Sequence, residues 1–251
     1  MSTSQGQRVD AAPQSRRDRL RAATEQEIRQ SARRLLVRDG LGAVSMRAVA
    51  DEMGMTSPAL YRYYASHEDV LEALIIDCFD ELIAALVAAR TDDDPGAQLI
   101  ATGRAFRRWA LDHPAEFSLV FGHPVPNLSH GPDGPIEACG MRLGQTFAEV
   151  FVGVWHTYRF PLPDDAAIDP IVAQQLRPHM ELLPALPMGA LHVFVTCWSR
   201  LIGMVSAEVF GQLGWAVEHT EPFFEEMLAE TAARLQMPRS LLGEGPRPQG
   251  P

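Results

Sequence analysis

Apolar residues recur at the three- and four-residue spacing of an α-helix through most of this chain, and no stretch of any length alternates in the manner of a strand. The strongest example is a single apolar stripe of about five helical turns near the C-terminus, formed by Leu191, Phe194, Val195, Trp198, Ile202, Val205 and Val209. The sequence therefore predicts an all-α protein, and its 251 residues suffice for one large domain or two modest ones.

Helix-ending signals divide the chain into a series of expected helices. The first begins at Thr24 and ends at Gly40, and two short helices of about nine and eight residues follow on either side of Gly54. The second short helix starts at Ser57-Pro58, where we expect Ser57 to accept a free backbone amide and Pro58 to occupy the first turn. Later helices are expected over residues 67–90, 97–112, 114–121, 136–158, 191–209 and 221–235, with connections rich in proline between them.

Charge is distributed unevenly along the chain. The formal net charge is −10, yet residues 1–70 hold 11 Arg against 9 acidic residues, and residues 71–251 hold 11 Arg against 23. Five arginines lie within the first 21 residues: Arg8, Arg16, Arg17, Arg19 and Arg21. Such an asymmetry is expected when one segment faces phosphates while the rest stays soluble, although a solvated, disordered tail would also explain the first residues.

The cysteine content and the distribution of apolar residues argue against disulfide-rich, zinc-binding, membrane-spanning and secreted proteins. The three cysteines, Cys78, Cys139 and Cys197, are too few and too far apart for a disulfide framework or a four-ligand zinc site. We expect no metal site and no cofactor. No uncharged apolar run reaches membrane-spanning length, and no apolar segment follows the N-terminal charges as in a signal peptide, so a cytoplasmic protein is predicted.

Catalytic motifs are also missing. The chain has no G-x-S-x-G, G-x-G-x-x-G, phosphate-binding loop or H-E-x-x-H motif, and without lysine it cannot form a Schiff base. We therefore predict that the protein is not an enzyme. An uncatalogued all-α enzyme remains an alternative, as does a helical adaptor that binds protein partners through the late apolar stripe.

The two short helices around Gly54 carry the functional signal. A packed pair of this size is a helix-turn-helix, whose second member is narrow enough to enter the DNA major groove. The segments SMRAVA (45–50), GMTSPALYRYY (54–64) and SHEDVL (66–71) resemble, in order, the N-terminal DNA-binding domain of tetracycline-repressor-like (TetR family) regulators. Residues 97–235 show a weaker similarity to the regulatory domains of such proteins.

The resemblance implies a set of DNA-contacting residues: Ser45, Arg47, Thr56, Ser57, Pro58, Tyr61, Arg62, Tyr63 and His67. Arg47 occupies a position that can reach a guanine edge, with a surface phosphate or an acidic partner as the alternative. His67 stands where lysine is usual, and an imidazole is mostly uncharged at neutral pH. We hypothesise that the arginine-rich N-terminal arm compensates by following the DNA backbone or entering the minor groove.

The resemblance also implies a domain order and a function. Residues 1–22 are expected to form a flexible arginine-rich arm, 23–68 the DNA-binding domain, 69–236 a helical regulatory and dimerisation domain, and 237–251 a disordered tail. The protein is expected to bind double-stranded operator DNA as a homodimer and to respond to a small-molecule effector. The resemblance favours a repressor over an activator.

Two further sets of residues follow for the regulatory half. The late helices are expected to form a four-helix bundle with a second copy, through Phe194, Trp198, Ile202, Val205, Phe223, Phe224 and Met227. Candidates for a ligand pocket are the aromatic residues Phe106, Trp109, Phe117, Phe121, Phe147, Trp155 and Trp198. Packing within the core of a single chain is the alternative for both sets.

Overall fold

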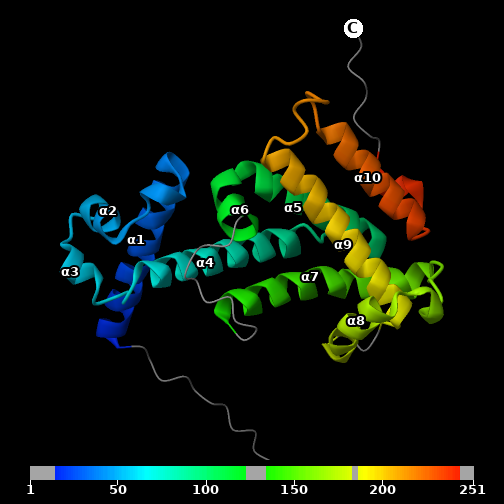
Figure 1. The fold of residues 1–251 in the computed structure, drawn as a ribbon, viewed down its shortest axis with the longest axis horizontal. Coiled ribbons are helices and arrows are strands. Elements are labelled where there is room, and N and C mark those ends of the chain that lie inside the picture. The colour runs from blue at the N-terminus through cyan, green and yellow to red at the C-terminus, as the bar shows by residue number, and fades with distance from the viewer. Residues whose placement is uncertain (1–14, 123–133, 183–185, 244–251) are drawn as a thin grey trace, which may run out of the picture. The chain divides into compact units, whose positions relative to one another are not determined.

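The computed structural model of the protein describes residues 15–122, 134–182 and 186–243, and these contain α-helices and short 3-10 turns but no strand (Figure 1). The helices are α1 (Arg16–Asp39), α2 (Met46–Glu52), α3 (Ser57–Leu60), α4 (His67–Ala88), α5 (Pro95–Asp112), α6 (Pro114–Phe121), α7 (Pro135–Tyr158), α8 (Pro170–Leu182), α9 (Met188–Val209) and α10 (Glu221–Arg234). The all-α prediction is confirmed. The predicted loop after Phe121 lies mostly outside the described residues.

The chain divides into two compact units, and the division falls inside α4, after Leu74. In the first unit α1 packs against α2, and α2 packs against α3. Their shared core contains fully or almost fully buried residues from each helix, among them Ile28, Val49 and Leu60. This core positions the two short helices.

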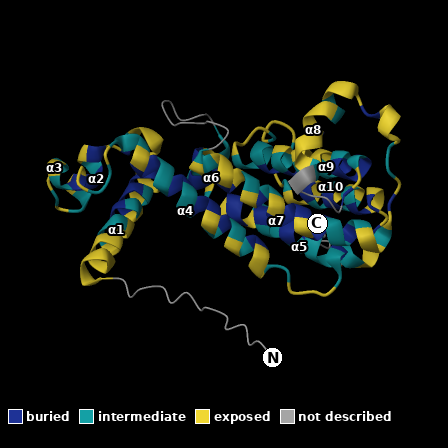
Figure 2. Cartoon of the chain, turned by 90° about the horizontal axis from the view of Figure 1, so that it is seen from below, coloured by how far each residue is buried: buried dark blue, intermediate teal, exposed yellow. Residues whose placement is uncertain are grey.

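The second unit is organised around α5, which packs against α6, α7, α9 and α10. Phe106 of α5 is completely buried, and its ring centroid lies 5.7–6.1 Å from those of Phe117, Phe121, Phe147 and Trp198. Aromatic rings bury large areas and favour such edge-on contacts. Figure 2 shows the buried residues as stripes along these helices, with exposed residues on the opposite faces.

The first helix begins earlier than predicted. It starts at Arg16 rather than Thr24, so Arg16, Arg17, Arg19 and Arg21 lie on α1 and not on a flexible arm, whereas Arg8 lies outside the described residues. Ser15 caps the helix: its Oγ accepts from the Asp18 amide at 3.1 Å, and its own amide donates to the Asp18 carboxylate at 3.3 Å. This reciprocal pair is a capping box, and it stabilises a start that has no buried apolar face.

Two more expectations are corrected in the second unit. Helix α8 lies in a segment that its proline and aspartate content predicts to be a connection. Pro178 lies inside the helix, and Asp169 caps its start by accepting from the Ile171 amide at 2.8 Å. Residues 237–243 were expected to be disordered, but Met237 is buried and Arg104 donates to the Leu242 carbonyl at 2.8 Å. Residues 244–251 lie outside the described part of the chain.

Helix α9 is long and apolar enough to span a membrane by length and composition alone. In the fold it packs against α5, α7, α8 and α10, and its Arg200 and Glu208 form ion pairs with Glu230 and Arg107. These contacts are those of a core helix in a globular unit.

The start of α5 is tied to the end of α7. The Asp94 carboxylate accepts from the amides of Gly96 (2.7 Å) and Ala97 (3.1 Å) and from the Tyr158 hydroxyl (2.7 and 2.8 Å). Burial raises the pKa of Asp94, but these hydrogen bonds outweigh it and hold the pKa below its ordinary value of 3.8. Burial and the adjacent carboxylate raise the pKa of Tyr158 to about 12.

Replacing Tyr158 with phenylalanine is expected to lower the free energy of unfolding by about 1 kcal/mol, because Asp94 loses one hydrogen-bond donor while solvent still screens the half-buried pair. Because the pKa of Asp94 is lower in the folded than in the unfolded protein, its ionised carboxylate stabilises the folded state. This stabilisation is complete at pH values above the pKa of the unfolded state and is lost as the pH falls through the folded-state pKa. Urea denaturation should therefore show the same loss at pH 6 and pH 8. A loss that vanishes at either pH would contradict this role for Tyr158.

Candidate nucleic-acid interface and regulatory site

The two short helices of the first unit are built by local signals. Ser45 caps α2 by accepting from the Ala48 amide at 3.2 Å, and Met46, Val49 and Ala50 turn inward. Gly54 then adopts φ +64°, a left-handed conformation that glycine adopts without steric cost, and this conformation turns the chain toward α3.

Helix α3 differs in detail from the prediction. It comprises only Ser57–Leu60, followed by turns, so the expected eight residues were too many. Thr56 rather than Ser57 stands at the capping position, and among the described residues its side chain makes no capping hydrogen bond. Leu60 is completely buried and anchors the helix, which leaves the polar residues of the segment on the outside.

Most of the predicted DNA-contacting residues reach solvent. Ser45, Arg47, Thr56, Pro58, Tyr61 and Arg62 are exposed, while Ser57, Tyr63 and His67 are partly buried. The exposed set presents hydroxyl groups, two guanidinium groups and a proline ring, which are groups that contact bases and phosphates. Whether these residues bind DNA stays a prediction.

Two of these residues have neighbours that bear on their roles. The Arg47 Nε lies 3.7 Å from the Asp51 carboxylate, and both side chains are largely exposed, so the acidic partner considered above is present without restraining the arginine strongly. The Nε2 of His67 is shielded from solvent and finds no hydrogen-bond partner among the described residues. This nitrogen is therefore not placed to contact a phosphate.

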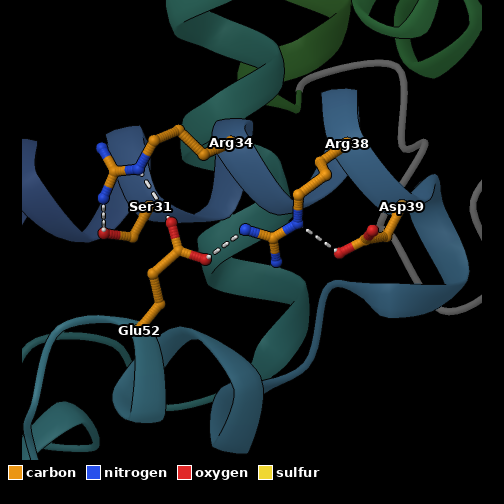
Figure 3. A network of polar contacts seen from close by, with 5 residues as sticks. All are labelled: Ser31, Arg34, Arg38, Asp39 and Glu52. Atoms are coloured by element: carbon orange, nitrogen blue, oxygen red, sulfur yellow. Dashed lines mark hydrogen bonds and ion pairs between the residues drawn. The ribbon is translucent and has the colours of Figure 1, made fainter.

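An ion-pair network fixes α2 against α1 (Figure 3). The Glu52 carboxylate of α2 accepts a hydrogen bond from the Arg34 Nε at 2.8 Å and forms an ion pair with the Arg38 Nη1 at 3.5 Å. Arg34 also donates to the Ser31 hydroxyl at 2.7 Å. The Glu52 side chain is only 17% exposed. Sequence reasoning missed this network, because no local pattern connects residues 34 and 52.

The start of α1 lies beside the end of α3 within the first unit. Arg16, Arg17, Arg21, Arg62 and Tyr63 line one open groove, and the Arg21 guanidinium sits 5.7 Å from the centre of the Tyr63 ring. Three arginines of α1 therefore lie beside Arg62, which lies just after the end of α3. Such a concentration of positive charge attracts a phosphate backbone.

The predicted dimer contacts divide into two groups. Val205 and Phe224 are completely buried within the chain itself, so the expectation that they face a second copy is wrong. Of the predicted apolar stripe of α9, Leu191 and Val205 are buried in the chain's own core, whereas Val195 is exposed. It shares the exposed side of that helix with Thr196, Ser199, Arg200 and Gly203. Of the other candidates, Phe194, Trp198 and Met227 border an internal cavity, Ile202 is partly buried, and Phe223 is half exposed.

The predicted pocket residues also separate. Phe147 and Trp198 border a cavity between α5, α7, α9 and α10, with ring centroids 4.7 Å apart. The others do not border that cavity: Phe106, Trp109, Phe117 and Phe121 pack in or beside the core around α5, and Trp155 packs against Phe160. Core packing thus accounts for most of this set.

Family models match both units of the chain. Residues 28–74 match the model described as bacterial regulatory proteins, tetR family, and residues 99–231 match the model described as tetracyclin repressor-like, C-terminal domain. The first match covers the exposed helix pair, and the second covers the cavity and the late helices.

Individual proteins and solved structures agree with these matches. The HTH-type transcriptional regulator Rv1816 of Mycobacterium tuberculosis is 34% identical over 79% of this chain and 86% of its own length. The solved structure of the regulatory protein SCO4313 is 30% identical, with a TM-score of 0.67 over 87% of this chain and all of that one. RolR in complex with the ligand resorcinol is 17% identical, covers 90% of this chain and 96% of its own, and has a TM-score of 0.54, which shows a shared fold.

Proposed function

Because the chain belongs to the tetracycline-repressor (TetR) family of transcriptional regulators, which are not enzymes, we propose that it is a cytoplasmic repressor that binds operator DNA as a homodimer. The first unit reads the DNA, and the second holds the contact between copies and the effector site. A small-molecule effector releases the repressor, as a ligand that favours a non-binding conformation does. The observation that carries the proposal is the set of exposed polar residues that flank α3, Thr56, Tyr61 and Arg62, around the buried anchor Leu60.

Within this function, the residues divide between reading and positioning. Arg62 and Arg47 offer guanidinium groups for guanine edges, while Thr56 and Tyr61 offer hydroxyl groups that fix the register on phosphates. The Glu52 network supports this arrangement, because it holds α2 at a fixed position on α1. The arginine groove at the start of α1 supplies further backbone contacts and takes the role that we assigned to a flexible arm.

Contact between two copies is proposed through the exposed side of α9. Val195, Ser199 and Gly203 share this side with Arg200, which pairs with Glu230 of α10 and so joins the two late helices. A two-fold symmetric pair of reading heads matches a palindromic operator.

Replacing Arg62 with alanine is expected to weaken operator binding by about 10- to 100-fold, because a guanidinium contact to a base or phosphate is lost from the centre of the interface. Fluorescence anisotropy with the DNA that flanks the protein's own gene measures the change, at several salt concentrations. A phosphate contact would also reduce the salt slope by about 1.

The matched control is Arg177→Ala, which removes an exposed arginine from α8 in the second unit and should bind the DNA like the wild type. If Arg62→Ala, Arg47→Ala and Tyr61→Phe all bind like the wild type, the proposed interface is wrong.

A further inference from the structure

The cavity in the second unit has aromatic walls. Phe147 and Phe151 of α7 face it from one side, and Phe194 and Trp198 of α9 border it from another. The Phe151 and Phe194 ring centroids are 5.3 Å apart, so the rings form a continuous apolar surface. Aromatic walls of this kind bind flat or slender apolar groups.

Polar groups at the cavity are few and uncharged. The Thr231 hydroxyl donates to the Met227 carbonyl at 2.9 Å, which leaves its oxygen free to accept one further hydrogen bond. Burial raises the pKa of the Cys197 thiol, so this group is neutral at neutral pH. The described residues that border the cavity include no arginine, histidine or carboxylate. Arg200 and Arg234 lie near enough to act on the Cys197 thiol, but neither borders the cavity, so an ion placed there would have no directly bordering partner for its charge, which is costly.

The space is small and is kept open by a glycine. The cavity measures about 50 Å³. A Cβ at Gly103 of α5 would lie 3.3 Å from the Leu228 Cδ2, so even alanine would crowd this wall. A ligand the size of one ring therefore needs the walls to give way. Met227 can yield, since methionine is unbranched and flexible.

We infer that this cavity is the effector site, and that the effector is a neutral, mainly apolar molecule of about single-ring size with at most one or two hydroxyl groups. The inference rests on the proposed function. Helices α9 and α10 supply Phe194, Trp198, Met227, Leu228 and Thr231 to the walls, and α9 carries the proposed contact between copies on its other side. A bound ligand displaces these helices and so alters the spacing of the two reading heads.

Three probes of matched size test the chemistry: benzyl alcohol (neutral), benzoate (anionic) and benzylamine (cationic). Calorimetric titration of the full-length protein should show saturable binding of benzyl alcohol and binding at least ~10-fold weaker for the two ions, because no charged side chain borders the cavity to pair with them. Equal binding of the three probes, or no binding of benzyl alcohol, would overturn the inference.

Two glycine variants test the location. Gly103→Ala fills the cavity and should weaken benzyl alcohol binding at least ~10-fold, whereas Gly144→Ala on α7, where a Cβ meets no described atom within 4 Å, should leave it unchanged. Cys197→Leu fills the same space from α9 and gives a second reading if Gly103→Ala does not fold. Unchanged binding in both cavity variants would place the probe elsewhere and refute the assignment.

Operator binding separates the two proposals. If ligand-free protein binds operator DNA but benzyl alcohol does not weaken that binding at saturation, the effector assignment fails and the proposed function stands. If benzyl alcohol binds as described but the protein binds no genomic DNA, the proposed function fails. The part of the inference that assigns the ligand a role in regulating DNA binding then fails as well.

Discussion

Replacing Arg107 with methionine is expected to lower the free energy of unfolding by about 3 kcal/mol, because removing one partner leaves a buried charge without compensation. The Arg107 Nε and Nη2 donate to the two carboxylate oxygens of Glu208 at 2.8 and 2.6 Å, and the Thr220 hydroxyl donates to the same carboxylate. The Glu208 side chain is only 6% exposed. The Arg107 guanidinium also lies over the Phe224 ring, 5.1 Å from its centre. Methionine keeps an apolar chain of similar length, so the loss reports mainly on the charge.

The double variant Arg107→Met/Glu208→Met is the control for this prediction. It removes both charges and should recover most of the lost stability in urea denaturation followed by circular dichroism. A double variant as unstable as the single one would show that packing, not the stranded carboxylate, causes the loss.

The same pair predicts a dependence on pH. Burial raises the pKa of Glu208, but the hydrogen bonds from Arg107 and Thr220 outweigh it and hold the pKa below its ordinary value of 4.5. A carboxylate whose pKa is lowered by folding stabilises the folded state at pH values above its pKa in the unfolded protein, and this contribution is lost as the pH falls further. The difference between wild type and Arg107→Met should therefore be full at pH 7 and shrink below about pH 4.5.

Replacing Gly203 with tryptophan is expected to raise the dissociation constant of the dimer at least ~100-fold and to weaken operator binding with it, since two linked reading heads bind far more tightly than one. Gly203 lies on the exposed side of α9, and a Cβ added there would have no described atom of the same chain within 4 Å. The large side chain should therefore leave the single chain folded but block close approach of a second copy. Analytical ultracentrifugation measures the association.

Gly140→Trp provides the matched control for the dimer. Gly140 is exposed on α7, and a Cβ there is equally free of described neighbours, but α7 carries no proposed contact between copies. This variant should stay dimeric and bind DNA like the wild type. If Gly203→Trp behaves in the same way, the exposed side of α9 is not the interface.

Helix ends were predictable from sequence where a proline in the first turn and a buried face occur together. Helices α5, α6, α7 and α10 begin and end within about two residues of their predicted limits. The start of α1 was missed because it lacks an apolar stripe, and α8 was missed because Pro178 and the prolines and aspartates around it indicate a connection. Their caps, Ser15 and Asp169, mark both starts.

The functional surfaces were harder to predict than the helices. Periodicity predicted an apolar stripe on α9 that is correct only in part, because Leu191 and Val205 are buried but Val195 is exposed, and the buried Val193 and Leu201 lie outside the predicted stripe. Periodicity also could not tell whether an apolar side faces the chain's own core or a second copy, and the structure places Val205 in the core. Contacts between distant residues, such as Glu52 with Arg34, leave no local trace in the sequence. The exposure of Tyr61 and Arg62, by contrast, follows directly from the spacing around Leu60.

The short turn after α10 matters for anyone who wishes to shorten or tag the protein. Arg104 of α5 binds both the Glu225 carboxylate and the Leu242 carbonyl, and Leu241 lies where a side chain at Gly96 would have to go. Truncation at the end of the last long helix, after Arg234, would delete the buried Leu235 and Met237 and remove one acceptor from that arginine. An affinity tag or fluorescent fusion is therefore best joined beyond residue 243, with the preceding segment left intact.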